Sequence, residues 1–147
     1  MTASRPLIPV GRPSSVFDSV GGHETFTALV DAFYDGVAQD EELIAMYPEG
    51  LELDGAKWRL QAFLEQYFGG PTTYSEQRGH PRLRMRHAPF PVTFDARDRW
   101  LTHMRAALDA VALPPMYDEL MWDYFQRAAT AMVNTGDGDR QPPGPLL

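Results

Sequence analysis

Histidine is the residue type in this 147-residue chain best suited to hold a metal, because cysteine is absent. The absence of cysteine excludes disulfides, thiolate zinc sites, iron–sulfur clusters and thiol nucleophiles. The four histidines are His23, His80, His87 and His103, and no two of them lie three or four residues apart. No Glu-x-x-His pattern falls in a helical stretch either, so neither a dinuclear carboxylate site nor a zincin site is expected. The kind of metal site that these exclusions leave is one with a single histidine ligand.

His87 is the strongest candidate for a single metal ligand. It follows a run of alternating apolar and basic residues, Leu83-Arg84-Met85-Arg86, and a proline close behind it would end a helix. A metal with one histidine ligand must bring its other ligands, as haem iron does with four porphyrin nitrogens. Neighbouring arginines could then meet the carboxylates of such a group. The alternative is a surface histidine in a basic loop. His80, in a Gly-His-Pro turn, competes for the role, and no function is expected for His23 or His103.

Three aromatic residues that carry a polar group lie in apolar surroundings. Tyr34 shares a helical face with Phe26 and Phe33, and Tyr47 and Trp100 also have apolar neighbours. A buried Tyr hydroxyl or Trp indole needs a hydrogen-bond partner. Each of the three could donate to a backbone carbonyl as an ordinary core residue. Together they could instead line a pocket and donate to a small bound ligand or to water.

The elements that must position these residues are predicted to be helices. Apolar residues recur three and four positions apart in four long segments, and a shorter segment ends at a Tyr-Pro pair. These segments cover about residues 26–37, 42–46, 60–68, 100–111 and 120–132. No stretch alternates with a period of two, so the fold class is all-α. Residues 71–91, rich in proline and arginine, are expected to form a long loop. Because long loops in compact domains are often functional, we expect the site there.

Composition limits the classes of function. An apolar content of 44% and an aromatic content of 12% are typical of one folded domain. The formal net charge is −7, and arginine is in excess only between residues 77 and 94, so no nucleic-acid partner is expected. No apolar run is long enough for a signal peptide or an integral membrane segment, which predicts a cytoplasmic protein. We expect the folded domain to cover residues 16–135, between flexible tails at 1–15 and 136–147.

Several motifs resemble those of the truncated haemoglobins, and particularly of their group II, or O-type, members. Phe33-Tyr34 is similar to a pair on the family's B helix, and Met46-Tyr47-Pro48-Glu49 to its CD corner. Residues 63–71 resemble the end of the E helix, and residues 74–90 resemble the pre-F loop and F helix. Arg97-Asp98-Arg99-Trp100-Leu101 is similar to the G helix. The resemblance covers about residues 16–135. It implies a two-over-two helical globin fold with a long pre-F loop.

The resemblance also implies roles for individual residues. His87 falls on the proximal haem ligand, and Tyr34, Tyr47 and Trp100 fall on the distal positions that hydrogen-bond the bound ligand. Ala56 falls where vertebrate globins have a distal histidine. The further residues implied to contact haem are Leu60, Phe63, Met85, Phe90 and Met104. The candidates for binding its propionates are Arg59, Arg84 and Arg86.

The function implied by the resemblance is that of a haem b globin. Oxygen, carbon monoxide or nitric oxide would bind at the His-ligated iron, and three hydrogen-bond donors would slow oxygen release. Tight retention suits oxygen or redox chemistry, or sensing, better than bulk transport. The alternative is a haem enzyme that reduces peroxide or detoxifies nitric oxide, and a third reading is an interaction module without a cofactor. The candidate protein partners are a reductase that keeps the iron ferrous and a second copy of the chain.

Overall fold

The fold is entirely helical over the residues that the structure, a computed structural model, describes, which are 15–47 and 50–135. In chain order the helices are α1 (Val16–Ser19), α2 (His23–Val37), α3 (Glu41–Ile44), α4 (Asp54–Tyr67), α5 (Thr73–Arg78), α6 (Leu83–His87), α7 (Phe94–Val111) and α8 (Pro115–Met132). The predicted all-α class is confirmed. The tails predicted at 1–15 and 136–147 lie outside the described residues, apart from Ser15. Within the described part of the chain, no helix is long and apolar enough to cross a membrane.

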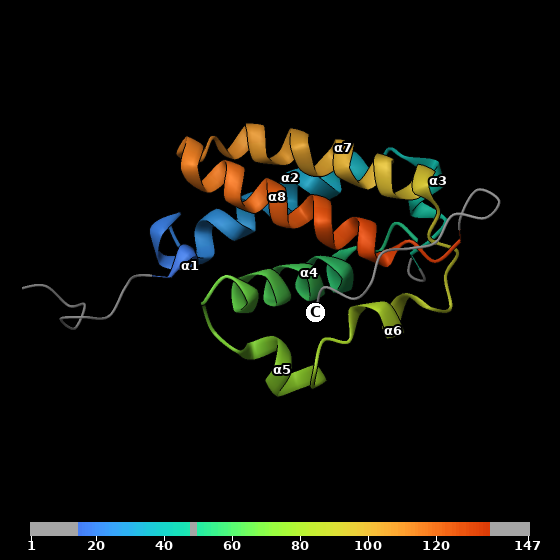
Figure 1. The fold of residues 1–147 in the computed structure, drawn as a ribbon, viewed down its shortest axis with the longest axis horizontal. Coiled ribbons are helices and arrows are strands. Elements are labelled where there is room, and N and C mark those ends of the chain that lie inside the picture. Colours follow the sequence, from blue (N-terminus) through green and yellow to red (C-terminus); the bar gives the residue numbers. More distant parts are fainter. Residues whose placement is uncertain (1–14, 48–49, 136–147) are drawn as a thin grey trace, which may run out of the picture.

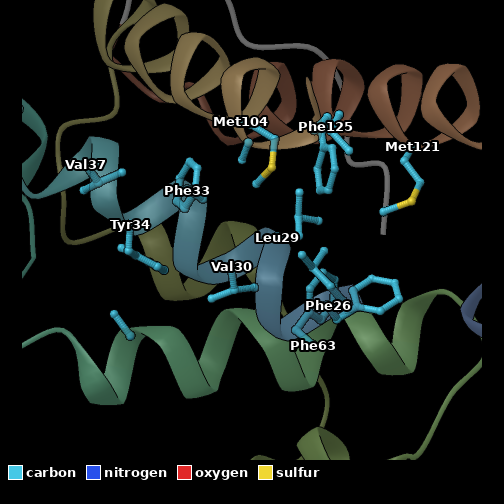
Figure 2. Close-up of a cluster of buried hydrophobic side chains, with 14 of the residues drawn as sticks. Phe26, Leu29, Val30, Phe33, Tyr34, Val37, Phe63, Met104, Met121 and Phe125 are labelled. Atoms are coloured by element: carbon cyan, nitrogen blue, oxygen red, sulfur yellow. The ribbon is translucent and has the colours of Figure 1, made fainter. Parts of the chain in front are cut away.

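Helix α2 runs through the centre of the molecule and supplies much of the core. Its side chains at the expected three- and four-residue spacing are buried, and Phe26, Val30 and Phe33 are completely enclosed. Helices α4, α7 and α8 pack around it. Figure 2 shows the result, with Phe33 of α2 near Met104 of α7, and Phe26 near Phe63 of α4. The amphipathic pattern of the sequence therefore places α2 between the other long helices.

The short helix α1 is fixed to the end of α4 by a close backbone approach. The Phe17 N–H donates to the Phe68 carbonyl over 2.9 Å. Gly70 lets the Phe17 ring approach, because a Cβ there would lie 2.7 Å from Phe17 Cδ1. Between α1 and α2, Gly21 and Gly22 have φ values of 114° and 69°, which glycine adopts without strain. These glycines let the chain turn sharply from α1 into α2.

Residues 71–91 differ in part from the predicted long loop. They contain α5 as well as the single-turn helix α6, and both lie on the side of α4 away from the α7–α8 pair (Figure 1). Tertiary contacts hold α5: the Gln66 side chain donates to Ser75 Oγ over 2.7 Å and accepts from the Ser75 N–H over 2.9 Å. Local periodicity does not reveal such contacts. The segment thus covers a face of α4 with two short helices rather than one loop.

Candidate functional site

A cavity of about 490 Å³ lies among residues of α2, α3, α4, α5, α6, α7 and α8. Its walls are mostly apolar, and arginines lie among the residues that line it. The residues predicted for the site that line it are Tyr34, Tyr47, Ala56, Arg59, Leu60, Phe63, Arg86, His87, Phe90 and Trp100. A cavity of this size and character is typical of a small-molecule or cofactor site.

His87, the last residue of α6, reaches the cavity with a defined tautomer. Its Nδ1 lies 2.8 Å from the Leu83 carbonyl oxygen, one helical turn earlier. A carbonyl only accepts hydrogen bonds, so Nδ1 carries the proton and Nε2 keeps its lone pair. The same arrangement orients many metal-ligating histidines. The Asn134 side chain donates to the His87 and Phe90 carbonyls over 3.2 and 2.9 Å, which ties this corner to the chain after α8.

Tyr34, Tyr47 and Trp100 bring three hydrogen-bond donors to the cavity from three parts of the chain. The Tyr34 and Tyr47 rings meet edge to face, with centroids 5.7 Å apart, and their hydroxyls are hydrogen-bonded. The Trp100 ring packs on Phe33, with centroids 4.9 Å apart. The indole N–H of Trp100 has no hydrogen-bond partner among the described residues. The three side chains therefore place polar groups along a wall that is mostly apolar.

The Tyr47 hydroxyl is protonated at neutral pH, and burial reinforces this. Burial raises the pKa of the Tyr47 hydroxyl above its ordinary value of 10.0, although the hydrogen bond with Tyr34 and the charge of Arg59 act in the opposite direction. At neutral pH the group is therefore a neutral phenol that can donate a hydrogen bond.

Three of the predicted site residues do not line the cavity. Met85 and Arg84 are exposed on the outer face of α6, because Leu83 and His87 already define its inner face. Met104 lies one turn beyond Trp100 on α7 and is fully buried in the core near Phe33 (Figure 2). The expectation that these three contact a bound group therefore has no support from their positions.

Four arginines line the cavity. Arg86 donates to the Pro81 and Arg78 carbonyls over 2.7 and 2.8 Å, so it closes the turn between α5 and α6. Arg97 donates to Asp98 Oδ1 over 2.8 Å. Arg78, which the sequence did not single out, stacks over the Tyr74 ring with its guanidinium carbon 5.9 Å from the centroid. Arg59, on α4, is the other arginine in the lining.

Sequence reasoning missed many of the lining residues. They are Leu43, Met46, Leu64, Tyr74, Arg78, Leu83, Val92, Ala96, Arg97, Tyr124, Phe125, Ala128, Ala129 and Met132. Those on α8 belong to the apolar face that predicts the helix, and a face turned to a cavity has the same spacing as one turned to the core. The small side chains of Ala128 and Ala129 are the available signal, because they leave room beside the helix.

Comparison with known proteins identifies the kind of cavity. The family model for bacterial-like globins matches residues 15–134. The chain is 39% identical over 118 residues to the group 2 truncated haemoglobin YjbI of Bacillus subtilis, covering 80% of this chain and 88% of that protein. The chain belongs to the group II truncated haemoglobins. It is therefore a globin that binds haem and small gaseous ligands.

Solved structures of truncated haemoglobins have the same fold. A thermostable haemoglobin from Thermobifida fusca is 56% identical, with a TM-score of 0.80 over 82% of this chain and 98% of that one. A truncated haemoglobin from Bacillus subtilis, described as oxygen-avid, is 37% identical, with a TM-score of 0.77 over 82% of this chain and all (100%) of that one. The truncated globin fold is thus confirmed.

The residues around the cavity fit the haem of this family. The imidazole of His87 leaves an unprotonated nitrogen, the walls suit an apolar macrocycle, and arginines among the lining residues suit its carboxylates. The charge and hydrogen-bonding requirements of haem are therefore met by side chains that already line one space.

Proposed function

We propose that this truncated haemoglobin holds haem b through His87 Nε2 and retains oxygen tightly, for oxygen or redox chemistry or for sensing rather than for bulk transport. The observation that carries the proposal is the presence of Tyr34, Tyr47 and Trp100, three side chains with hydrogen-bond donors, in the same mostly apolar cavity as a histidine whose Nδ1 is hydrogen-bonded to a carbonyl. When bound, haem would supply an iron that can take up a diatomic ligand.

The chain's own residues would control how long such a ligand stays. Phenol and indole donors would stabilise a bound diatomic ligand that gains partial negative charge. A hydrogen bond contributes about 1 kcal/mol, and more when the cavity excludes water. The oxygen-avid description of the Bacillus subtilis relative agrees with slow release. A reductase that keeps the iron ferrous is the protein partner that this function requires.

The proposal is tested by absorption spectra of the purified protein and of a His87→Gly variant. We expect stoichiometric haem in the wild type, with a Soret band that shifts on reduction and on addition of oxygen or carbon monoxide. In His87→Gly the band should weaken or be lost, and added imidazole should restore it. His80→Gln is the matched control, because His80 lies in the same region but does not line the cavity. An unchanged spectrum in His87→Gly would overturn the assignment of the ligand.

A further inference from the structure

A positively charged surface lies on the outer side of α6, at the periphery of the helical bundle (Figure 1). Arg82 and Arg84 are exposed, and Met85 beside them is 59% exposed. An open hollow continues this surface from α6 to the end of α8, and residues 88–91 form part of its lining. No Asp or Glu occurs between residues 77 and 94. Arg82, Arg84, Met85 and this hollow together are termed the α6 patch.

The two arginines of the α6 patch keep their positive charge unpaired. The side chains of Arg82 and Arg84 have no ion-pair or hydrogen-bond partner among the described residues. By contrast, each arginine of α7 and α8 is paired with at least one aspartate, and these arginines are Arg97, Arg99, Arg105 and Arg127. The formal net charge of the whole chain is −7. The α6 patch is therefore a local positive region on an acidic protein.

Arg82 carries its charge at a position where the backbone favours glycine. Its φ and ψ are 44° and 54°, in the left-handed region that side chains other than glycine rarely adopt. Glycine would fit this conformation with less strain but would bring no charge. Backbone strain of this kind is found mainly at functional sites. The conformation therefore supports a role for the Arg82 guanidinium outside the fold itself.

Hydrogen bonds hold the hollow of the α6 patch in shape. The Asn134 side chain donates to the His87 and Phe90 carbonyls and also accepts from the Val92 N–H over 2.9 Å. The Val92 carbonyl in turn accepts from the N–H groups of Asn134 and Thr135 over 3.0 and 3.1 Å. A surface that is already fixed loses little conformational entropy when a partner binds. Arginine and methionine are also residue types enriched at protein interfaces.

We propose that the α6 patch is the docking surface for an acidic electron-carrier protein, which supplies single electrons to iron held by His87. The inference rests on the proposed function, because it names the surface and the kind of partner that would keep the iron ferrous. His87 is the last residue of the same five-residue helix. A carrier docked on α6 is thus close to the iron ligand, and the rate of electron transfer falls steeply with distance.

The electron count of this transfer balances. One electron leaves the reduced redox group of the carrier, which is oxidised by one electron. The same electron converts ferric iron to ferrous iron. No covalent bond forms or breaks between the two proteins, and the transfer itself moves no proton.

The charge distribution favours an acidic carrier over a basic one. Exposed acids are frequent on other parts of the molecule, such as Asp35, Glu41 and Glu42 around the end of α2 and the start of α3. They would repel an acidic carrier, whereas the α6 patch would attract it, so the two effects together orient the encounter. A basic carrier would instead be drawn to the acidic surfaces and away from α6.

The test uses a plant-type ferredoxin, an acidic protein that carries one electron on an iron–sulfur cluster. Surface plasmon resonance measures binding of oxidised ferredoxin, which requires no electron transfer. Stopped-flow spectroscopy under carbon monoxide measures reduction of the ferric, haem-loaded protein by reduced ferredoxin. We expect both the affinity and the rate to fall as salt concentration rises. In Arg84→Glu, both should be about fivefold lower than in the wild type at low ionic strength.

Arg127→Glu is the matched control for Arg84→Glu, because it changes the net charge by the same amount. Arg127 lies on α8, is paired with Asp123 and does not line the hollow. Its affinity and rate should stay close to those of the wild type. Soret intensity and melting temperature establish that each variant is folded and loaded.

Arg82→Gly separates charge from fold. Glycine suits the left-handed conformation at residue 82, so the melting temperature should not fall. Loss of the guanidinium should still weaken ferredoxin binding by about threefold at low ionic strength. A variant that is as stable as the wild type but binds ferredoxin less well cannot be explained by misfolding.

Four results would overturn the proposed docking surface. One is the absence of salt-dependent ferredoxin binding to the wild type, and another is an equal effect of Arg84→Glu and Arg127→Glu. The third is a set of ferredoxin-induced NMR shifts that lies outside residues 82–91 and 132–135. The fourth is a wild-type dimer, seen by sedimentation, that dissociates in Arg84→Glu, because a second copy of the chain would then occupy the patch.

Failure of this inference is distinguishable from failure of the proposed function. A wild-type protein that takes up no haem contradicts the proposed function. A protein with normal ferric, ferrous and carbonmonoxy spectra, to which ferredoxin does not bind at the α6 patch, contradicts only the inference about docking.

Discussion

The three polar hydrogens in the cavity are not equivalent at the scale of single residues. The hydroxyls of Tyr34 and Tyr47 are hydrogen-bonded to each other, so a ligand must share them. The indole of Trp100 has no partner among the described residues, and its ring is held by Phe33 and Phe125. A donor already fixed in place and not otherwise engaged loses little on binding a ligand. Trp100 is therefore expected to contribute most directly to ligand retention.

Replacing Trp100 by Phe should speed oxygen dissociation. Loss of one hydrogen bond of about 1–1.5 kcal/mol corresponds to roughly a five- to tenfold faster release. The measurement is stopped-flow displacement of oxygen by carbon monoxide. Met104→Leu is the control, because Met104 lies on the same helix but in the core. An off-rate in Trp100→Phe that equals that of the control would show that the indole does not hold the ligand.

The residues of the site were predictable to the extent that their types are unusual. A histidine beside arginines and three polar aromatics in apolar segments can be recognised from sequence. The histidine, Arg86 and the three aromatics line one cavity, whereas Arg84 does not. The sequence of a five-residue helix does not show which of its sides faces the cavity. For this reason Met85 was expected to line the cavity and Leu83 was not. Tyr124 was missed for another reason, since its spacing on α8 equals that of core residues.

At the scale of elements, a buried carboxylate joins α3 to α7. Asp40 accepts from the Leu43 N–H at the start of α3, over 3.3 Å, and from His103 Nε2 and Arg99 Nη1 of α7, over 2.9 and 3.2 Å. Burial alone would raise the pKa of Asp40, but the hydrogen bonds from His103 and Leu43 and the charge of Arg99 outweigh it and lower the pKa. Because Tyr47 follows α3 closely, this contact also helps to fix one cavity donor.

The lowered pKa of Asp40 predicts how stability depends on pH. A carboxyl whose pKa is lower in the folded state stabilises the fold above its ordinary pKa of 3.8 and loses that contribution as pH falls through the folded value. Asp40→Asn should lower the free energy of unfolding by about 1–2 kcal/mol at neutral pH, and by less near pH 3. Urea unfolding followed by circular dichroism measures both.

The control for Asp40 is Asp35→Asn on the neighbouring turn of α2. The Asp35 side chain has no ion-pair or hydrogen-bond partner among the described residues, and it is exposed. Its replacement should leave stability nearly unchanged at every pH. A difference between Asp40→Asn and the wild type that does not shrink in acid would contradict the linkage.

The contact between α1 and α4 predicts a steric effect at Gly70. An added Cβ would lie 2.7 Å from Phe17 Cδ1 and 2.9 Å from the Glu65 carbonyl oxygen. Gly70→Ala should therefore lower the free energy of unfolding by about 1–3 kcal/mol. The same substitution in a Phe17→Leu background should lower the free energy of unfolding by less, because the aromatic ring that the added Cβ would meet is absent. An equal cost in both backgrounds would show that the Phe17 ring is not what excludes a side chain.

The long helices were predictable because their apolar spacing persists over several turns, as on α2 from Phe26 to Val37. Of the short helices, α3 was predicted from the sequence as the segment at 42–46, and the others were predictable only through resemblance or not at all. Helix α5 depends on the Gln66–Ser75 hydrogen bonds, and α1 on the backbone bond between Phe17 and Phe68. These contacts join residues 9 and 51 positions apart. The local sequence pattern does not predict such pairings.

At the scale of the whole molecule, α5 and α6 cover the cavity without a core of their own. Tyr74 is the only buried residue of α5, and α6 has none among its described residues. In Figure 1 the two helices extend along the far side of α4 from the rest of the bundle. Tyr74 of α5 and Leu83 and His87 of α6 line the cavity, as does Phe90 just after α6.

Haem should therefore stabilise this segment more than the rest of the fold. A ligand that binds only the folded state stabilises that state by its binding free energy. The stabilisation is greatest in the segments that the ligand contacts. Hydrogen–deuterium exchange should show amides of residues 79–91 strongly protected on addition of haem, with smaller changes in α2 and α7. Equal protection along the chain, or none in residues 79–91, would contradict this expectation.

Helices α5 and α6, which cover the cavity with few buried residues of their own, also affect how long a newly synthesised chain survives. Without haem, we expect residues 79–91 to open more readily than the long helices, and proteases cleave chains where the backbone opens. With haem held as proposed, the same residues would be anchored through the His87 imidazole and the cavity walls. The abundance of the protein would then follow the supply of haem, because chains that fail to acquire it are degraded first.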